Sequence, residues 1–207
     1  MNAWSKLADE AAIATTIEAL AKNGITATVA EDGAAAKAKV LEIIPKGAQV
    51  MTMTSMTLSA IGVVDEFNDS GNYDSVRAQF AKMDQEKSED ALEMRRLGVA
   101  PEWTVGSAHA VTQDGSVVIA SNTGSQLPAY AYGAGHVVWV VGAQKIVKNF
   151  DEAMKRIYEY VLPLESERAN KAYNITTGSN VSKLLVVNKE VQPGRISIIL
   201  VKEKLGF

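Results

Sequence analysis

The chain has 207 residues, a formal net charge of −3 and no cysteine. This length favours one α/β domain that buries a substantial core. Acidic and basic residues are spread along the chain, so we expect neither nucleic acid nor a membrane as a partner. Without cysteine, the chain itself can hold no disulfide, no thiolate-bound zinc and no iron–sulfur cluster.

Residues 1–24 predict a helix. Ile13, Ile17 and Leu20 recur at helical spacing, and Asn23-Gly24 supplies a left-handed stop. This stretch is acidic and interrupted by polar residues, unlike a signal peptide, and no apolar run approaches membrane-spanning length. We therefore expect a cytoplasmic protein with a helical arm at 1–24 and an α/β domain at 25–207.

Strands and helices alternate through the rest of the chain. The predicted strands cover 25–31, 48–55, 103–112, 116–121, 136–143, 183–188 and 195–201. The predicted helices cover 33–44, 55–67, 73–97 with a break near Ser88, and 150–173 with a bend at Pro163. This order predicts an α/β fold with a mixed, mostly parallel sheet and helices on both faces. Asp114-Gly115, between two apolar runs, predicts one antiparallel hairpin.

Two turns place small polar residues between a strand and a helix. At the first turn, Ser55 and Thr57 lie where the free N–H groups of a helix start could bind an anion, although hydroxyls there also cap helices. The second turn offers hydroxyls, an amide and a flexible glycine at Asn122, Thr123, Gly124 and Ser125. Since ligands of open α/β sheets bind at the carboxyl ends of strands, we expect both turns to line one anion pocket.

A few ionisable residues lie near strand ends. Glu31, Asp114 and Lys145 could act in catalysis there, or they could be ordinary turn and surface charges. His109, within a predicted strand, is a candidate ligand-binding residue or a structural histidine. With only two histidines and no paired ligand spacing, the sequence predicts no metal site.

Three stretches resemble the LUD domain, the lactate-utilisation family. They are "SMTLSAIG" at 55–62, "HAVTQDG" at 109–115 and "VVGAQKIVKNFDEAMKR" at 140–156. The resemblance implies a fold similar to the sugar-isomerase and CoA-transferase superfamily, in which phosphates, acyl groups or CoA are bound at strand-to-helix turns. Many relatives carry an asparagine in place of His109. Many also have an arginine where this chain has "GSQLPAY" at 124–130.

The resemblance also implies a function. Such domains belong to lactate-oxidising complexes whose other subunits carry iron–sulfur clusters, so we expect an accessory component that binds a small anionic metabolite. It would have no cofactor of its own, and its partners would be iron–sulfur oxidoreductase subunits. Two alternatives stay open: a stand-alone isomerase or acyl-transfer enzyme, with Asp114 or Glu31 as base and Lys145 as cationic partner, and a non-catalytic structural subunit. The sequence also leaves open a homo-oligomer.

Overall fold

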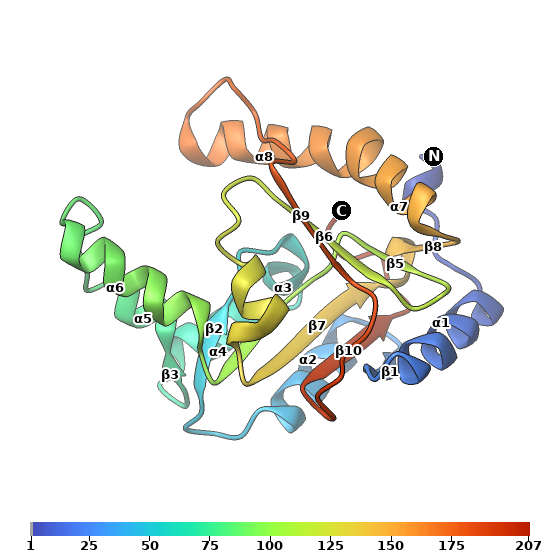
Figure 1. The fold of residues 1–207 in the computed structure, drawn as a ribbon, viewed down its shortest axis with the longest axis horizontal. Helices are drawn as coiled ribbons and strands as arrows, with labels where there is room; N and C mark the ends of the chain where they lie inside the picture. The colour runs from blue at the N-terminus through green and yellow to red at the C-terminus, as the bar shows by residue number, and fades with distance from the viewer. Residues whose placement is uncertain (1) are drawn as a thin grey trace.

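A computed structural model describes residues 2–207 as an α/β protein with two sheets (Figure 1). The larger sheet has six strands, and every neighbouring pair in it is parallel. The strands lie in the order β1 (Thr26–Ala30), β10 (Ile196–Val201), β7 (His136–Gly142), β4 (Trp103–Gly106), β2 (Gln49–Thr52) and β3 (Asp74–Ser75). The predicted fold class is therefore confirmed.

The central strand β7 has no Asp, Glu, Lys or Arg because both of its faces are buried. Val137 and Trp139 belong to the apolar cluster on one face of the sheet, and Val138 and Val140 to the cluster on the other. Alternate side chains of a strand point to opposite faces, so a strand covered on both faces reads as one continuous apolar run.

Helices and the second sheet cover these faces. The main helices are α1 (Glu10–Lys22), α2 (Gly33–Ile43), α3 (Met56–Ala60), α4 (Val63–Asp69), α5 (Val76–Phe80), α6 (Ser88–Val99), α7 (Phe150–Arg156) and α8 (Leu162–Tyr173). On one face, α1 contributes Ile13 and Leu20 to the largest apolar cluster. On the other face, α2, α3 and α4 pack against the sheet. Within residues 2–207, no helix has the length and apolar character needed to cross a membrane.

The predicted hairpin forms a second sheet instead of joining the first. This sheet has the order β8 (Ile146–Val147), β5 (Ala110–Thr112), β6 (Val117–Ser121) and β9 (Lys183–Val187). Only β5 and β8 are parallel; β6 is antiparallel to both of its neighbours. The prediction of one continuous strand over 103–112 is wrong. Strand β4 ends at Gly106, and residues 107–109 cross to β5 in the second sheet.

The helical segments differ from the prediction in two places. Residues 74 and 75, predicted to belong to a helix over 73–97, form the strand β3. The helix predicted at 55–67 is two helices, α3 and α4, separated at Gly62, whose φ is 64°. The predicted break near Ser88 is confirmed, since α6 begins there. The bend predicted near Pro163 coincides with a π-helical turn, Ile157–Val161, between α7 and α8. Proline cannot donate the backbone hydrogen bond that a regular α-helix needs at this position.

Candidate functional site

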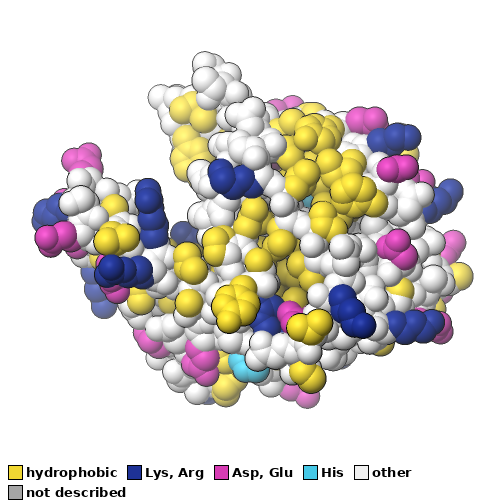
Figure 2. Space-filling model, viewed as in Figure 1, with side chains coloured by type: hydrophobic (Ala, Val, Ile, Leu, Met, Phe, Trp, Pro, Cys, Tyr) yellow, Lys and Arg dark blue, Asp and Glu magenta, His cyan; other side chains and the backbone are white. Residues whose placement is uncertain are grey.

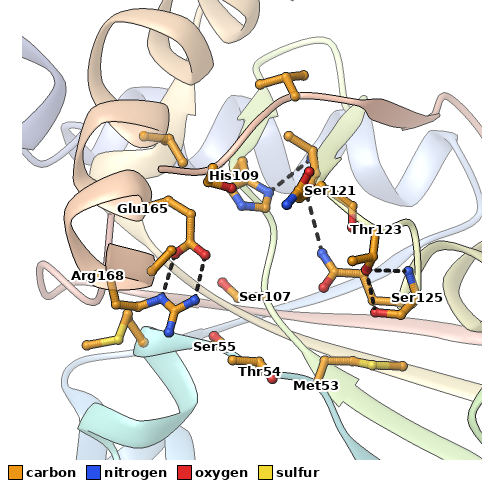
Figure 3. Close-up of a pocket in the computed structure, with 18 of the residues that line it drawn as sticks. Met53, Thr54, Ser55, Ser107, His109, Ser121, Thr123, Ser125, Glu165 and Arg168 are labelled. Atoms are coloured by element: carbon orange, nitrogen blue, oxygen red, sulfur yellow. Dashed lines mark hydrogen bonds and ion pairs between the residues drawn. The ribbon is translucent and has the colours of Figure 1, made fainter. Parts of the chain in front are cut away.

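A cavity of about 560 Å³ opens where the larger sheet, the second sheet and α8 meet. Its lining comes mainly from the turn after β2, the 107–109 crossing, the turn after β6, the helices α5 and α6, and the side of α8. In Figure 3, Glu165 and Arg168 lie on one side of the cavity, Thr123 and Ser125 on the other, and Ser107 between them. Figure 2 shows a hollow in the surface between two parts of the molecule. The helices α5 and α6 lie on one side of it, and α8 lies on the other.

Lys145 lies at the floor of this cavity and is only 2% exposed. Its Nζ lies 3.0 Å from Thr57 Oγ1 and 3.2 Å from Ser107 Oγ, and donates to both hydroxyls. Among residues 2–207, no ion pair involves Lys145. Burial, and then the positive charge of Arg156, lower the pKa of Lys145 to about 7. The amine is therefore partly neutral at physiological pH.

Thr57 orients the lysine. Its side chain is 1% exposed, and its hydroxyl donates to the carbonyl of Leu205 at 3.1 Å. With its only proton used in this way, the Thr57 oxygen acts as an acceptor for Lys145. The sequence singled out Thr57 as a helix-start hydroxyl, but its bond to Lys145 could not be read from the local pattern.

Sequence reasoning missed Ser107 as a functional residue. Ser107 is the first residue after β4, in the segment that crosses between the sheets, and its partly exposed hydroxyl lines the cavity. Ser55 was singled out because it is a small polar residue directly after a buried strand, and Ser107 has the same position after β4. This position was not recognised because residues 103–112 were predicted to form one continuous strand.

His109 also lines the cavity. Its Nδ1 accepts a hydrogen bond from the backbone N–H of Ala120 at 3.1 Å, and its carbonyl accepts from Arg156 at 2.6 Å. Burial, followed by the charges of Lys145 and Arg156, lowers the pKa of His109 to about 3. The ring is therefore neutral, and since Nδ1 is an acceptor, Nε2 carries the proton. His109 can donate a hydrogen bond but is not available as a base.

The two turns expected to share a pocket line the same cavity. Ser55 lines it and also caps α3, because its Oγ accepts from the N–H of Leu58 at 3.3 Å. In the second turn, Asn122, Thr123 and Ser125 line the cavity. The two turns do not lie together for the reason that we expected, which was that both follow parallel strands of one sheet. The second turn follows β6, which belongs to the second sheet and is antiparallel to its neighbours.

Gly124 shapes the second turn without lining the cavity. Its φ is 85°, a conformation that residues with a Cβ rarely adopt. An added Cβ would also come within 2.5 Å of Lys183 Cδ. The N–H of Gly124 donates to Ser121 Oγ at 2.9 Å, which closes the turn. Gly124 therefore positions its neighbours.

Two predicted catalytic carboxylates lie elsewhere, which corrects their expected place in the site. Asp114 precedes β6 in the hairpin and the cavity turn follows β6, so the two lie at opposite ends of one strand. There the carboxylate of Asp114 accepts from the Thr112 hydroxyl, and its carbonyl accepts from the amide of Asn23. Glu31 follows the edge strand β1, on the other side of β10 and β7 from β4, and pairs with Lys202 at 3.1 Å.

The chain matches a known family over most of its length. The sequence pattern of the LUD domain matches residues 13–201. The chain belongs to the LUD domain family. This family is linked to lactate utilisation.

A solved structure agrees in fold with this LUD-domain chain. It is the crystal structure of a DUF162 family protein from Deinococcus radiodurans, with a TM-score of 0.55 and 13% sequence identity. The match covers 95% of this chain and 99% of that one, and at this identity it shows the shared fold alone. Among curated proteins, none matches the chain.

The donor set of the site suits an anion better than a metal ion. In the part of the chain that the structure describes, residues 2–207, no group of three or more His, Asp or Glu side chains could hold a metal ion. The cavity instead gathers N–H and O–H donors around Lys145, and Glu165 is the acidic side chain in its lining. Carboxylate and phosphate oxygens accept such donors.

Proposed function

We propose that this LUD-domain chain binds a small anionic metabolite, with the anionic group at Lys145, as an accessory component of lactate or other 2-hydroxy-acid oxidation. The oxidising steps would belong to partner subunits that carry iron–sulfur clusters. One observation carries the binding proposal: Lys145 is a buried amine with two hydroxyls as hydrogen-bond partners and no ion pair among residues 2–207.

The electrostatics of Lys145 support an anionic ligand. Burial disfavours the charged form of the amine, which is why its pKa falls to about 7. A bound carboxylate or phosphate would supply the missing opposite charge and raise that pKa again. Binding near pH 8 would then be accompanied by proton uptake, which calorimetry detects as a dependence of the binding enthalpy on the buffer.

The lining of the cavity supports a ligand with both an anionic and an apolar part. Ser55 and Ser107 offer hydroxyl donors, and Met53, Phe80 and Ile157 give apolar surface. A volume of about 560 Å³ is in the usual range of metabolite pockets, from roughly 300 to 1,000 Å³. Such a cavity can take a ligand larger than lactate, including a phosphorylated sugar or an acylated carrier.

The test is a thermal-shift and calorimetry panel with lactate, pyruvate, sugar phosphates, CoA and folates. A ligand at a hundred times its dissociation constant is expected to stabilise the protein by about 2.7 kcal/mol. Lys145→Met should abolish this stabilisation. The matched control is Lys202→Met, because Lys202 pairs with Glu10 and Glu31 away from the cavity. If no compound in the panel stabilises the protein, or if Lys145→Met binds as well as the parent chain, the proposal is overturned and a structural subunit is favoured.

A further inference from the structure

We propose that Ser107, Lys145 and Thr57 form a nucleophile, a general base and an orienting group, with which the chain accepts an acyl group from an ester or thioester. This activity goes beyond the binding proposed above, although both use the same cavity. The three side chains come from three separate elements: the 107–109 crossing, the short turn after β7, and α3.

The geometry is that of an activated hydroxyl. Such a site needs a nucleophile within hydrogen-bond reach of a base, and a third group that orients the base. Lys145 Nζ lies 3.2 Å from Ser107 Oγ and 3.0 Å from Thr57 Oγ1. When the amine is neutral, one N–H directed at Thr57 leaves its lone pair free to accept the Ser107 proton.

Ser107, and not Thr57, is the reactive hydroxyl. Thr57 is buried, and its proton is donated to the carbonyl of Leu205. Ser107 is partly exposed to the cavity. Its other possible acceptors, Thr57 Oγ1 and the carbonyl of Ala108, both lie at 3.4 Å, which is long for a hydroxyl donor. The Ser107 proton is therefore not committed to a strong acceptor.

The charges around Lys145 favour the neutral amine that a base requires. The positive charge of Arg156 of α7 acts on Lys145 in this direction, while His109 of the crossing is neutral and adds no charge. No ion pair within residues 2–207 holds Lys145 in its protonated form. His109 lines the same cavity and carries its ring proton on Nε2, so this N–H can donate to a bound ligand.

The reaction has two balanced steps. In the first, Ser107 Oγ bonds to the acyl carbon, Lys145 takes the serine proton, and the C–O or C–S bond breaks as the leaving group receives that proton. In the second, water adds to the acyl carbon and gives its proton to Lys145, and Ser107 Oγ leaves and is reprotonated. The sum is an ester or thioester plus water giving an acid plus an alcohol or thiol.

The wall formed between α7 and α8 suggests the class of acyl group. Ile157, Val161 and Leu162 line the cavity on that side, with Met53 and Phe80 from other elements. These side chains present apolar surface to a short hydrocarbon chain. A short-chain acyl ester or thioester therefore fits better than a highly polar acyl group.

The experiment combines a fluorophosphonate probe with p-nitrophenyl butyrate as an acyl donor. Intact-protein mass spectrometry and peptide mapping of the full chain should show one probe adduct, on Ser107, and Ser107→Ala should lose it. Lys145→Met should lower the labelling rate at least about 100-fold, the lower end of general-base contributions. Ser116→Ala is the matched control, because the Ser116 hydroxyl bonds Asn188 outside the cavity, and it should label like the parent chain.

The pH dependence of labelling tests the base separately, should Lys145→Met fail to fold. The rate in the unmodified chain should rise from pH 5 to pH 8 and level off above the lysine pKa of about 7. The proposal is overturned if folded protein gives no adduct, if the adduct forms on another residue, if Lys145→Met labels at the parent rate, or if Lys145 itself is acylated or trapped by borohydride. Anion binding without Ser107 labelling would remove only this inference, whereas labelling without anion binding would remove only the proposed function.

Discussion

Among the cationic side chains that line the cavity, Arg168 on its wall and Lys145 on its floor have opposite environments. Arg168 donates from Nε and Nη2 to the two carboxylate oxygens of Glu165, each at 2.7 Å. These hydrogen bonds are the main reason that the pKa of Arg168 is raised. Lys145 has hydroxyl partners only, and its pKa is lowered by burial.

The difference shows that a cationic side chain can bind an anionic ligand readily only where no carboxylate of the protein already neutralises it. The charge of Arg168 is already balanced, so its contribution is to fix this part of α8 beside the cavity. The charge of Lys145 is buried with two hydrogen bonds but without an opposite charge among the described residues, so its electrostatic cost is only partly offset. Four experiments test this contrast between the two side chains.

The largest effect is expected from Lys145→Met on ligand-dependent stability. Removing the cation should abolish about 2.7 kcal/mol of stabilisation by an anion at a hundred times its dissociation constant. Without ligand, the variant should be at least as stable as the parent chain, because methionine removes a buried charge and keeps the volume. Urea unfolding with and without the anion measures both quantities. A variant that keeps the ligand stabilisation would show that Lys145 is not the anion contact.

The second effect is a pH dependence of stability that is caused by Lys145. Its folded pKa of about 7 lies below the ordinary value of 10.5, so between these values the unfolded chain binds one more proton than the folded chain. The free energy of unfolding should therefore rise with pH by about 1.4 kcal/mol per unit. The destabilisation is fully present below pH 7 and is relieved as the pH rises.

Comparing the parent chain with Lys145→Met at pH 7, 8 and 9 isolates this contribution. The difference between the two unfolding free energies should change in favour of the parent chain as the pH rises, and a saturating anion should flatten it. Parallel profiles without ligand would mean that the lysine is not titrating in this window.

A smaller effect is expected from Glu165→Gln on the wall. Its ion pair is partly exposed, so the loss of unfolding free energy should be about 1 kcal/mol or less. The freed Arg168 guanidinium should then strengthen anion binding, by roughly fivefold if it contributes about 1 kcal/mol. Calorimetry on the variant measures the affinity. A weaker affinity would show that Glu165 orders the cavity and does more than neutralise Arg168.

The smallest effect is expected from Asp114→Asn. Asparagine keeps most of the turn chemistry of the hairpin, so stability should change by no more than about 0.5 kcal/mol. Anion affinity should not change, because Asp114 lies at the end of β6 away from the cavity. Asp114→Ala, which loses the bond to Thr112, should be the less stable of the two in thermal melts. Altered affinity in Asp114→Asn would place this carboxylate back in the functional site.

Local patterns in the sequence determined much of the fold. The apolar run of β7 predicted a buried strand, Asp114-Gly115 predicted the hairpin, and Ser88 marked the start of α6. These features depend on side-chain periodicity, turn conformation and helix ends, which involve neighbours within a few residues. The hydroxyls of Ser55 and of the 122–125 turn were found for the same reason.

Only the tertiary structure decided which of these groups meet. Lys145 is 88 residues from Thr57 and 38 from Ser107 along the chain. Their contact depends on the order of strands in the larger sheet and on the crossing at 107–109 into the second sheet. Glu31 and Asp114 also lie near strand ends, yet the strand order and the antiparallel pairing of β6 place them away from the cavity. Periodicity assigns a residue to a strand, but strand order is fixed by long-range packing that no local pattern contains.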